Sequence, residues 1–242
     1  MFDLTGKTAL VTGATQGIGF AIAALLAKQG AKVFVNGASS EEKCRAASSK
    51  IPGSVPVRAD LTKKEDIDAL FEKTGGVDIL VLNASVQYKR EWDGFSEAEL
   101  DMQLDCNLKS SYILIRKYAP YMQKRHYGRI VTVGSVNQYN NHPELVLYGV
   151  TKAAQKKLAE SIAPRLAPYG VTINNIAPGA INTPRNAEAL SDAEFNKKVI
   201  SGIPAGYVGT PSDIAPAVLL LCSDEGRYIT GSEIIIDGGM HL

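Results

Sequence analysis

The chain has 242 residues, a length that fits one large α/β domain or at most two small ones. Its residues are 45% hydrophobic and 21% charged, an ordinary balance for a globular protein that excludes extensive disorder. With 26 Lys and Arg against 25 Asp and Glu, the chain has no general attraction to nucleic acid or to an anionic membrane.

Short β-rich runs alternate with helical stretches along the first part of the chain. A helix is predicted at residues 17–29, with apolar side chains along one face and Gly30 in the position of a C-terminal glycine. Runs of β-branched and aliphatic residues predict strands at residues 7–12, 31–36, 55–61 and 77–83.

The alternation continues to the end of the chain. Helices are predicted at residues 97–124, 145–163 and 213–222, and strands at residues 128–135, 170–179 and 233–237. Pro164 predicts that the second of these helices ends near Ala163 or kinks there, because proline disrupts a helix interior.

Strands that alternate with helices predict parallel pairing, and near-continuously apolar strands predict a sheet that is covered on both faces. No linker or repeat divides the chain. The sequence therefore predicts a single doubly wound α/β Rossmann domain over residues 1–242, with a seven-stranded parallel sheet and helices on both faces.

Several other kinds of protein are disfavoured. Residues 8–27 are uncharged and long enough to span a bilayer, but glycine and hydroxyl residues interrupt them, so a strand, a turn and a helix fit better. The three cysteines form no CxxC pair, which favours a reducing cytoplasm. The three histidines lack metal-ligand spacing, so no metal site is expected.

A glycine-rich turn follows the first predicted strand directly and opens the first helix, with the sequence TGATQGIG at residues 12–19. Glycines let the backbone approach a ligand closely, and the free N–H groups of a helix N-terminus favour a phosphate. This position in the first βαβ unit predicts a dinucleotide site, with candidate residues Gly13, Thr15, Gln16, Gly17, Ile18 and Gly19.

A second candidate constellation involves a tyrosine and a lysine. Among ten tyrosines, Tyr148 alone has a lysine four residues later, Lys152, and such residues share one face of a helix. A nearby ammonium favours the phenolate form, which suits a general acid or base. Ser135 ends the fifth predicted strand, so it should lie near the same carboxyl edge of the sheet.

Taken together, these motifs resemble the short-chain dehydrogenase/reductase family over essentially the full length of the chain. The resemblance is carried by the TGxxxGxG turn, by Ser135 with the YxxxK motif, and by LNAS at residues 82–85, where the family usually reads NNAG. The sequences around the fifth strand and at the C-terminus are most similar to bacterial 3-oxoacyl-(acyl carrier protein) reductases and to sugar and polyol dehydrogenases.

The resemblance implies an NAD(P)-dependent oxidoreductase that interconverts a ketone and a secondary alcohol by hydride transfer. It implies that Tyr148 exchanges a proton with the substrate oxygen, while Ser135 positions that oxygen. Lys152 would favour the ionised tyrosine and hold the nicotinamide ribose, and Asn107 would support a water relay to Lys152. Further cofactor contacts are implied at Asp60, Leu61, Asn83, Pro178, Gly179, Ile181 and Thr183.

The choice of cofactor depends on the end of the second predicted strand. No acidic residue there would repel a 2′-phosphate, and no arginine is there to hold one. Gln16 stands where many NADP-using relatives carry a basic residue. Ala38 and Ser39 are the candidate contacts, and the serine hydroxyl favours NADP(H), with NAD also open.

Two substrate classes remain open. The amide-rich loop at residues 136–144 and the polar residues 87–90 favour a keto-sugar, polyol or sugar acid. A 3-oxoacyl thioester on an acidic carrier protein would instead need basic residues beside the mouth, for which Lys124, Arg125 and Arg129 are candidates.

Other expectations concern motion and assembly. Residues 186–206 form a candidate lid, because they are polar and contain two glycines. The resemblance implies a cytoplasmic homotetramer, with no nucleic-acid or membrane partner. An alternative function is a non-catalytic NAD(P)-binding sensor or scaffold, although the Ser, Tyr and Lys residues disfavour it.

Overall fold

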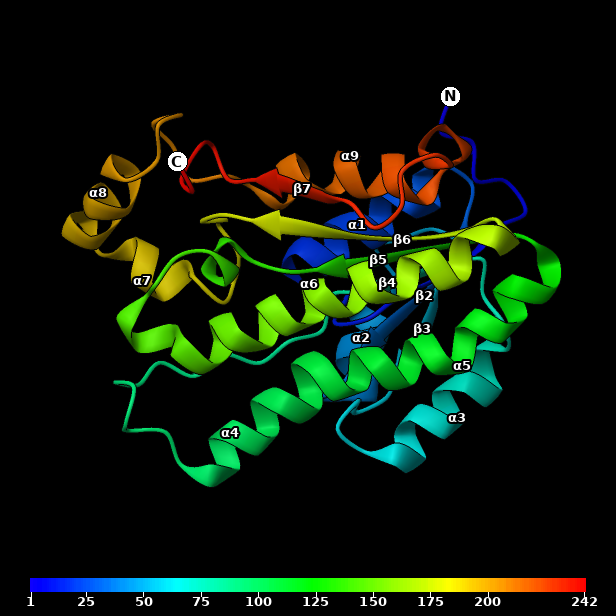
Figure 1. The fold of residues 1–242 in the computed structure, drawn as a ribbon, viewed down its shortest axis with the longest axis horizontal. Coiled ribbons are helices and arrows are strands. Elements are labelled where there is room, and N and C mark those ends of the chain that lie inside the picture. The colour runs from blue at the N-terminus through cyan, green and yellow to red at the C-terminus, as the bar shows by residue number, and fades with distance from the viewer.

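A seven-stranded parallel sheet runs through the middle of the molecule, in a computed structural model that describes all 242 residues (Figure 1). The strand order is β3-β2-β1-β4-β5-β6-β7, and every neighbouring pair is parallel. The predicted fold class is therefore confirmed. The strands are β1 Thr8–Val11, β2 Lys32–Gly37, β3 Val55–Arg58, β4 Ile79–Leu82, β5 Gly128–Val133, β6 Val171–Pro178 and β7 Glu233–Ile236.

Helices connect the strands and cover the sheet. Two crossover helices, α2 and α3, were not predicted, because each is short and buries only a few residues, among them Cys44 in α2 and Ile67 in α3. The α-helices are α1 Gly17–Lys28, α2 Glu41–Ser48, α3 Lys64–Thr74, α4 Glu97–Gln103, α5 Ser110–Arg125, α6 Val146–Leu166, α7 Ala187–Ser191, α8 Ala193–Ser201 and α9 Pro211–Cys222.

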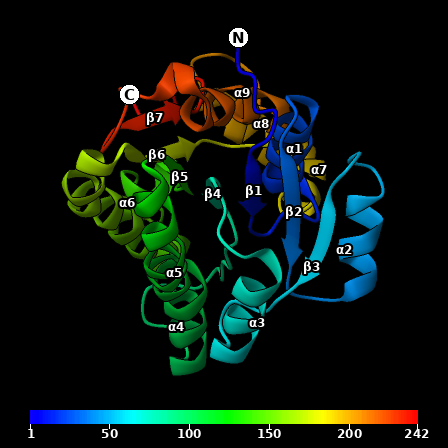
Figure 2. The same cartoon turned by 90° about the vertical axis from the view of Figure 1, so that its right-hand side faces the viewer.

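Alternate residues of each strand pack into different layers, because successive side chains point to opposite faces of a sheet. Ala9 and Val11 of β1 belong to a core of 24 buried residues that includes α1 and α9. Leu10 belongs to a second core of 21 buried residues, on the face covered by α3, α5 and α6 (Figure 2). The near-continuously apolar strands thus reflect burial on both faces.

The first long helical stretch is not uniform. Residues 97–125 form α4, a π-helical segment Leu104–Lys109 and α5 in succession. Asn107 lies in the π-helical segment, where the backbone hydrogen-bonding pattern is wider than in an α-helix.

Helix α6 does not stop at Ala163 but continues through Pro164 to Leu166, so of the two expectations for this proline only a kink stays open. The proline removes one backbone donor from the last turn, and buried Ala163 and Leu166 anchor that turn.

Residues 8–27 fold as β1, the glycine turn and most of α1 in succession, as predicted. No helix has the length and apolar character needed to cross a membrane.

Candidate active site

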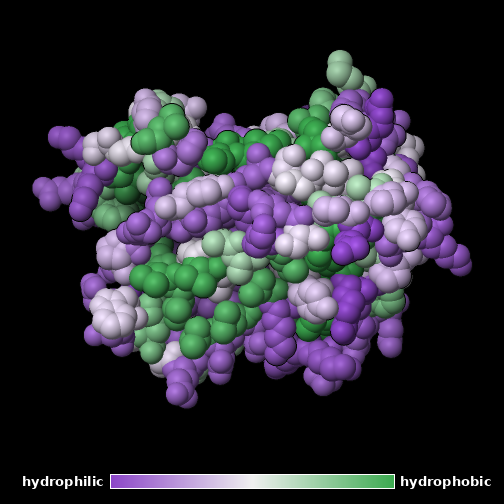
Figure 3. Space-filling view, in the orientation of Figure 1, coloured by the Kyte–Doolittle hydropathy of each residue, from purple (hydrophilic) through white to green (hydrophobic).

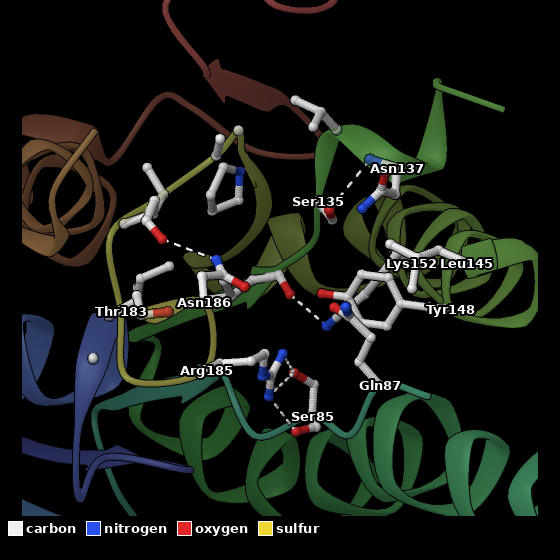
Figure 4. Close-up of a pocket in the computed structure, with 18 of the residues that line it drawn as sticks. Ser85, Gln87, Ser135, Asn137, Leu145, Tyr148, Lys152, Thr183, Arg185 and Asn186 are labelled. Atoms are coloured by element: carbon white, nitrogen blue, oxygen red, sulfur yellow. Dashed lines mark hydrogen bonds between the residues drawn. The ribbon is translucent and has the colours of Figure 1, made fainter. Parts of the chain in front are cut away.

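A cavity of about 390 Å³ opens at the carboxyl ends of β1, β4, β5 and β6 (Figure 4). The glycine turn before α1 forms one wall. The loops after β4 and β5, the start of α6 and the segment from β6 to α8 form the others. Loops at this edge of a parallel sheet are where ligands bind in open α/β folds.

The glycine turn is shaped by close backbone approaches. Gly13 and Gly17 have positive φ angles of 61° and 59°. A Cβ atom at Gly19 would lie 2.4 Å from Nδ2 of Asn83. The same Nδ2 donates hydrogen bonds to the carbonyl oxygens of Thr12 and Gly13 at 2.9 and 3.0 Å, so Asn83 fixes the turn against β4.

The N-terminus of α1 faces the cavity without a protein partner. Its N-cap, Gln16, makes no side-chain hydrogen bond to the helix, and the first turn contains no acidic residue. The positive end of the helix dipole and its free N–H groups therefore suit the pyrophosphate of a dinucleotide. All six predicted residues of this turn line the cavity: Gly13, Thr15, Gln16, Gly17, Ile18 and Gly19.

Ser135, Tyr148 and Lys152 line the same cavity, and each is nearly buried. Ser135 lies just beyond β5, and its Oγ accepts a hydrogen bond from the Asn137 N–H at 3.2 Å. Tyr148 lies in the first turn of α6, and Lys152 follows one turn later with its Nζ 5.7 Å from the centre of the tyrosine ring. In Figure 4 the tyrosine hydroxyl points into the cavity.

The ammonium of Lys152 is almost wholly removed from solvent, with 1% of the residue exposed. This burial, together with the positive charge of Arg185, lowers the pKa of Lys152 to about 7. Its Nζ donates to the carbonyl oxygen of Val133 at 2.7 Å and to Oε1 of Gln155 at 3.2 Å. Of the three N–H groups of a lysine ammonium, one thus remains for a ligand.

A chain of buried hydrogen bonds continues from this lysine. Nε2 of Gln155 donates to Oγ of Ser111 at 2.8 Å, and that hydroxyl donates to the carbonyl oxygen of Asn107 at 3.1 Å. Asn107 itself does not line the cavity. The water relay between Asn107 and Lys152 stays a prediction, whereas Gln155 and Ser111 form a direct hydrogen-bonded path between them that the sequence does not predict.

The side chain of Asn107, unlike its backbone carbonyl, bonds to the loop after β4 and to α6. Its Oδ1 accepts from the N–H of Val86 at 2.8 Å, and its Nδ2 donates to the carbonyl oxygen of Val86 and to Oγ1 of Thr151, each at 3.0 Å. These bonds fix the loop after β4 and connect the π-helical segment to α6.

The family model described as "Enoyl-(Acyl carrier protein) reductase" matches residues 13–241. The chain is 36% identical over 241 residues to a 3-oxoacyl-[acyl-carrier-protein] reductase of Rickettsia prowazekii, with 99% of each chain covered. It is also 36% identical over 249 residues to 3beta-hydroxysteroid dehydrogenase 1 of Eggerthella lenta, covering 99% of this chain and 95% of that one. The chain belongs to the short-chain dehydrogenase/reductase family.

A solved structure agrees with this membership. A candidate NAD(P)-dependent gluconate 5-dehydrogenase from Beutenbergia cavernae, with NADP bound at low occupancy, superposes with a TM-score of 0.92. Its sequence is 32% identical, and the match covers 99% of this chain and 98% of that chain. The present chain is accordingly an NAD(P)-dependent oxidoreductase that interconverts a ketone and a secondary alcohol.

Ser85 occupies a position where the family usually has glycine, and the structure shows what its hydroxyl contacts. Both terminal nitrogens of Arg185 donate to Oγ of Ser85 at 3.1 Å, and Nη2 also donates to its carbonyl oxygen at 2.6 Å. Arg185 is not among the residues predicted from the sequence. Its signal was a basic residue two positions after Thr183, in the loop expected to lie along the nicotinamide.

The adenosine end of the predicted dinucleotide site lies outside the cavity lining. Ala38 and Ser39 are exposed, Leu61 is buried, and Oδ1 of Asp60 accepts hydrogen bonds from Thr62. The expectation that no arginine stands at the end of β2 is wrong. Nε of Arg58 donates to the carbonyl oxygen of Ala38 at 3.2 Å, because parallel pairing brings the end of β3 beside β2.

The residues proposed to meet a carrier protein lie elsewhere. Lys124 and Arg125 end α5, and Arg129 begins β5, at the opposite end of that strand from Ser135. Arg129 is 3% exposed and pairs with Asp224 at 3.1 Å. The expectation that these residues flank the mouth of the cavity is therefore wrong.

The loop after β6 does reach the cavity. Gly179 passes so close to β7 that a Cβ there would lie 2.7 Å from Cα of Asp237. Residues 186–206, the candidate lid, include α7 and α8 and contribute Phe195 and Val199 to the lining. The other predicted residues of this region, Pro178, Gly179, Ile181 and Thr183, also line the cavity.

Proposed function

We propose that this member of the family reduces a small polar ketone with NADPH, or oxidises the matching alcohol with NADP⁺, and that Tyr148 is its proton donor and acceptor. The observation that carries the proposal is the meeting of Ser135, Tyr148 and Lys152 in one cavity that also contains a phosphate-binding glycine turn. A sensor or scaffold without turnover would not need this constellation.

In this mechanism, the nicotinamide supplies or accepts the hydride when the cofactor is bound. Tyr148 donates its hydroxyl proton to the substrate oxygen during reduction and takes it back during oxidation. The Ser135 hydroxyl donates a hydrogen bond to the same oxygen and holds it beside the tyrosine. The Lys152 ammonium stabilises the tyrosinate that remains, and the carbonyl oxygens of Val133 and Gln155 hold this ammonium in place.

Two features of the adenosine end support NADP(H). The end of β2 carries no carboxylate that would repel a 2′-phosphate. Arg58 lies beside Ala38 and is 35% exposed, so its guanidinium can turn to a phosphate placed near Ala38 and Ser39.

The mouth of the cavity supports a hydroxylated, sugar-type substrate. Gln87, Asn137 and His142 line it and are half-buried, so a bound ligand that covers them further should offer them polar partners. The far-side location of Arg125 and Arg129 removes these two residues as contacts for a carrier protein. A 3-oxoacyl thioester remains the second candidate, because of the 36% identity to the Rickettsia reductase.

Residues 1–242 are proposed to act as one catalytic domain with residues 186–206 as its lid, in a cytoplasmic homotetramer. Hydrophobic residues gather over α6 and its border with α4 and α5 (Figure 3). Val150 of α6 and Tyr112 of α5 are 57% and 47% exposed. A contiguous exposed apolar surface supports an interface with another subunit. Sedimentation of a stable monomer at micromolar concentration would contradict this assembly.

The substrate class is tested by following nicotinamide absorbance with purified protein. NADPH and NADH are offered in parallel with keto-sugars, keto-sugar acids and a short 3-oxoacyl thioester. The proposal is supported if NADPH is oxidised faster with the keto-sugars and keto-sugar acids than with the thioester. Fast oxidation on the thioester alone assigns the protein to the second candidate.

A further inference from the structure

The charges that line the cavity are all positive. Among its 33 lining residues are Lys89, Lys152 and Arg185, whereas aspartate and glutamate are absent. In the mechanism above, Lys152 is buried and serves the tyrosine. Lys89 and Arg185 therefore remain as cations that the proposed chemistry does not use.

Neither of these two cations is neutralised within the chain. The twelve salt bridges of the structure involve other residues. The partners of Arg185 are the hydroxyl and the carbonyl oxygen of Ser85, which are uncharged. The guanidinium is thus held in a fixed orientation, and its positive charge stays available to pair with an anion.

The two cations come from opposite walls of the cavity. Lys89 belongs to the loop after β4, and its Nζ lies 5.7 Å from the ring centre of Phe195 on α8. Arg185 follows β6 and reaches across to Ser85 on the loop after β4 (Figure 4). A ligand that enters between the walls therefore passes both cations.

The position of Arg185 favours the substrate over the cofactor phosphates. The phosphates have a partner in the N-terminus of α1, and it is Thr183 that faces this turn, 3.5 Å from where a Cβ of Gly17 would lie. Arg185 points instead to Ser85. Its positive charge is also one cause of the lowered pKa of Lys152, after burial.

We propose that Arg185, oriented by Ser85 and assisted by Lys89, binds a carboxylate of the substrate. This inference rests on the proposed function and narrows it, since the substrate becomes a hydroxy or keto acid of the sugar type rather than a neutral ketone. Ser85 is then a positioning residue, and Arg185 is the residue that determines specificity.

The test compares a carboxylate with its uncharged counterpart in a binding experiment. A six-carbon keto-sugar acid and its methyl ester are titrated calorimetrically into the complex of the protein with NADP⁺. The proteins are the wild type, Arg185→Gln, Arg185→Lys and the control Lys197→Gln, which removes an exposed lysine of α8 outside the cavity lining. NADPH affinity is measured for each by fluorescence.

We expect the wild type and the control to bind the acid about tenfold to a hundredfold more tightly than the ester, as a charge-assisted pair would produce. Arg185→Gln should lose this preference while binding the ester and NADPH normally, and Arg185→Lys should retain part of it. The inference is overturned if the wild type shows no preference, or if Arg185→Gln keeps it. Weaker NADPH binding by Arg185→Gln with the preference intact would likewise overturn it, and would assign the arginine to the cofactor.

The same titrations separate this inference from the proposed function. If the acid binds with an Arg185-dependent preference but no ketone is reduced in the absorbance assay, the carboxylate site stands and the proposed reaction fails. If ketones are reduced without any preference for acids, the reaction stands and the carboxylate site fails.

Discussion

The floor and the mouth of the cavity are built in opposite ways. The floor comprises Tyr148 and Lys152, together with Gln155 and Ser111, which lie behind Lys152 and outside the cavity lining. Lys152, Gln155 and Ser111 are at most 2% exposed and are connected by hydrogen bonds that run to Asn107. At the mouth, Lys89 and Arg185 are exposed and lie on loops. The difference indicates that the floor fixes the reaction, whereas the mouth selects the substrate.

The largest expected effect comes from removing the reactive group of the floor, the hydroxyl of Tyr148. Tyr148→Phe should lower kcat by about a hundredfold to ten-thousandfold, because the substrate oxygen loses its proton donor. NADPH affinity should stay near the wild-type value, since the glycine turn is untouched. Steady-state rates and fluorescence titration measure the two quantities, with Tyr228→Phe, at a residue that is 99% exposed, as the control. Near-normal turnover by Tyr148→Phe would refute the mechanism.

The second-largest effect is expected outside the floor and the mouth, at the adenosine end of the dinucleotide site. Arg58→Leu should weaken NADPH about tenfold and leave NADH almost unchanged, because only NADPH carries the 2′-phosphate. The ratio of kcat/KM for the two cofactors measures this effect. Arg45→Leu, which removes an exposed arginine of α2, is the matched control. An equal loss for both cofactors would show that Arg58 acts through its contact with Asp66 instead.

A smaller effect on the floor is expected from replacing Gln155, one of the two hydrogen-bond acceptors of Lys152. Gln155→Leu removes an acceptor from the buried ammonium, so the pKa of Lys152 should fall further below its present value of about 7. If the charged lysine supports turnover, activity declines as pH rises through this pKa. The variant should therefore lose activity at a lower pH than the wild type, with a several-fold lower kcat at neutral pH.

A second substitution at position 155, which should shift the pKa of Lys152 in the opposite direction, controls for packing damage. Gln155→Glu places a negative charge beside Lys152, so it should raise the pKa of Lys152 and extend activity to higher pH. The pH dependence of kcat for both variants provides the test. Identical pH profiles for the two would show that Gln155 only fills space.

The smallest effect is expected at the mouth. Ser85→Gly restores the usual family residue and removes the hydroxyl acceptor of Arg185, while the carbonyl oxygen at position 85 still holds the guanidinium. KM for an acidic substrate should rise about twofold to fivefold, as expected for a neutral hydrogen bond, and kcat should not change. A fall in kcat with KM unchanged would instead place Ser85 among the groups that act on the reaction itself.

The sequence predicted the floor far better than the mouth. Tyr148 and Lys152 are four residues apart on one helix, and Ser135 lies just beyond the carboxyl end of β5, so local spacing and the parallel sheet place them together. Gln155 and Ser111, in contrast, lie 44 residues apart and meet only through the packing of α5 against α6. No periodicity identifies such a pair.

The wrong expectations about Arg58 and Arg129 have the same origin. Arg58 is absent from the neighbourhood of Ala38 in sequence, but the pairing of β2 with β3 brings it there. Arg129 looks like a surface cation in sequence, but it is buried against Asp224, 95 residues away. Contacts between distant segments decide both cases, and they become visible only in the folded chain.

The most direct test of the contrast between floor and mouth is one kinetic comparison. The kcat and KM values of Gln155→Leu and Arg185→Gln are measured on the same keto-sugar acid with saturating NADPH at neutral pH. The account predicts that Gln155→Leu lowers kcat with little change in KM, and that Arg185→Gln raises KM with little change in kcat. If both variants shift the same parameter, the separation of chemistry from selection is wrong.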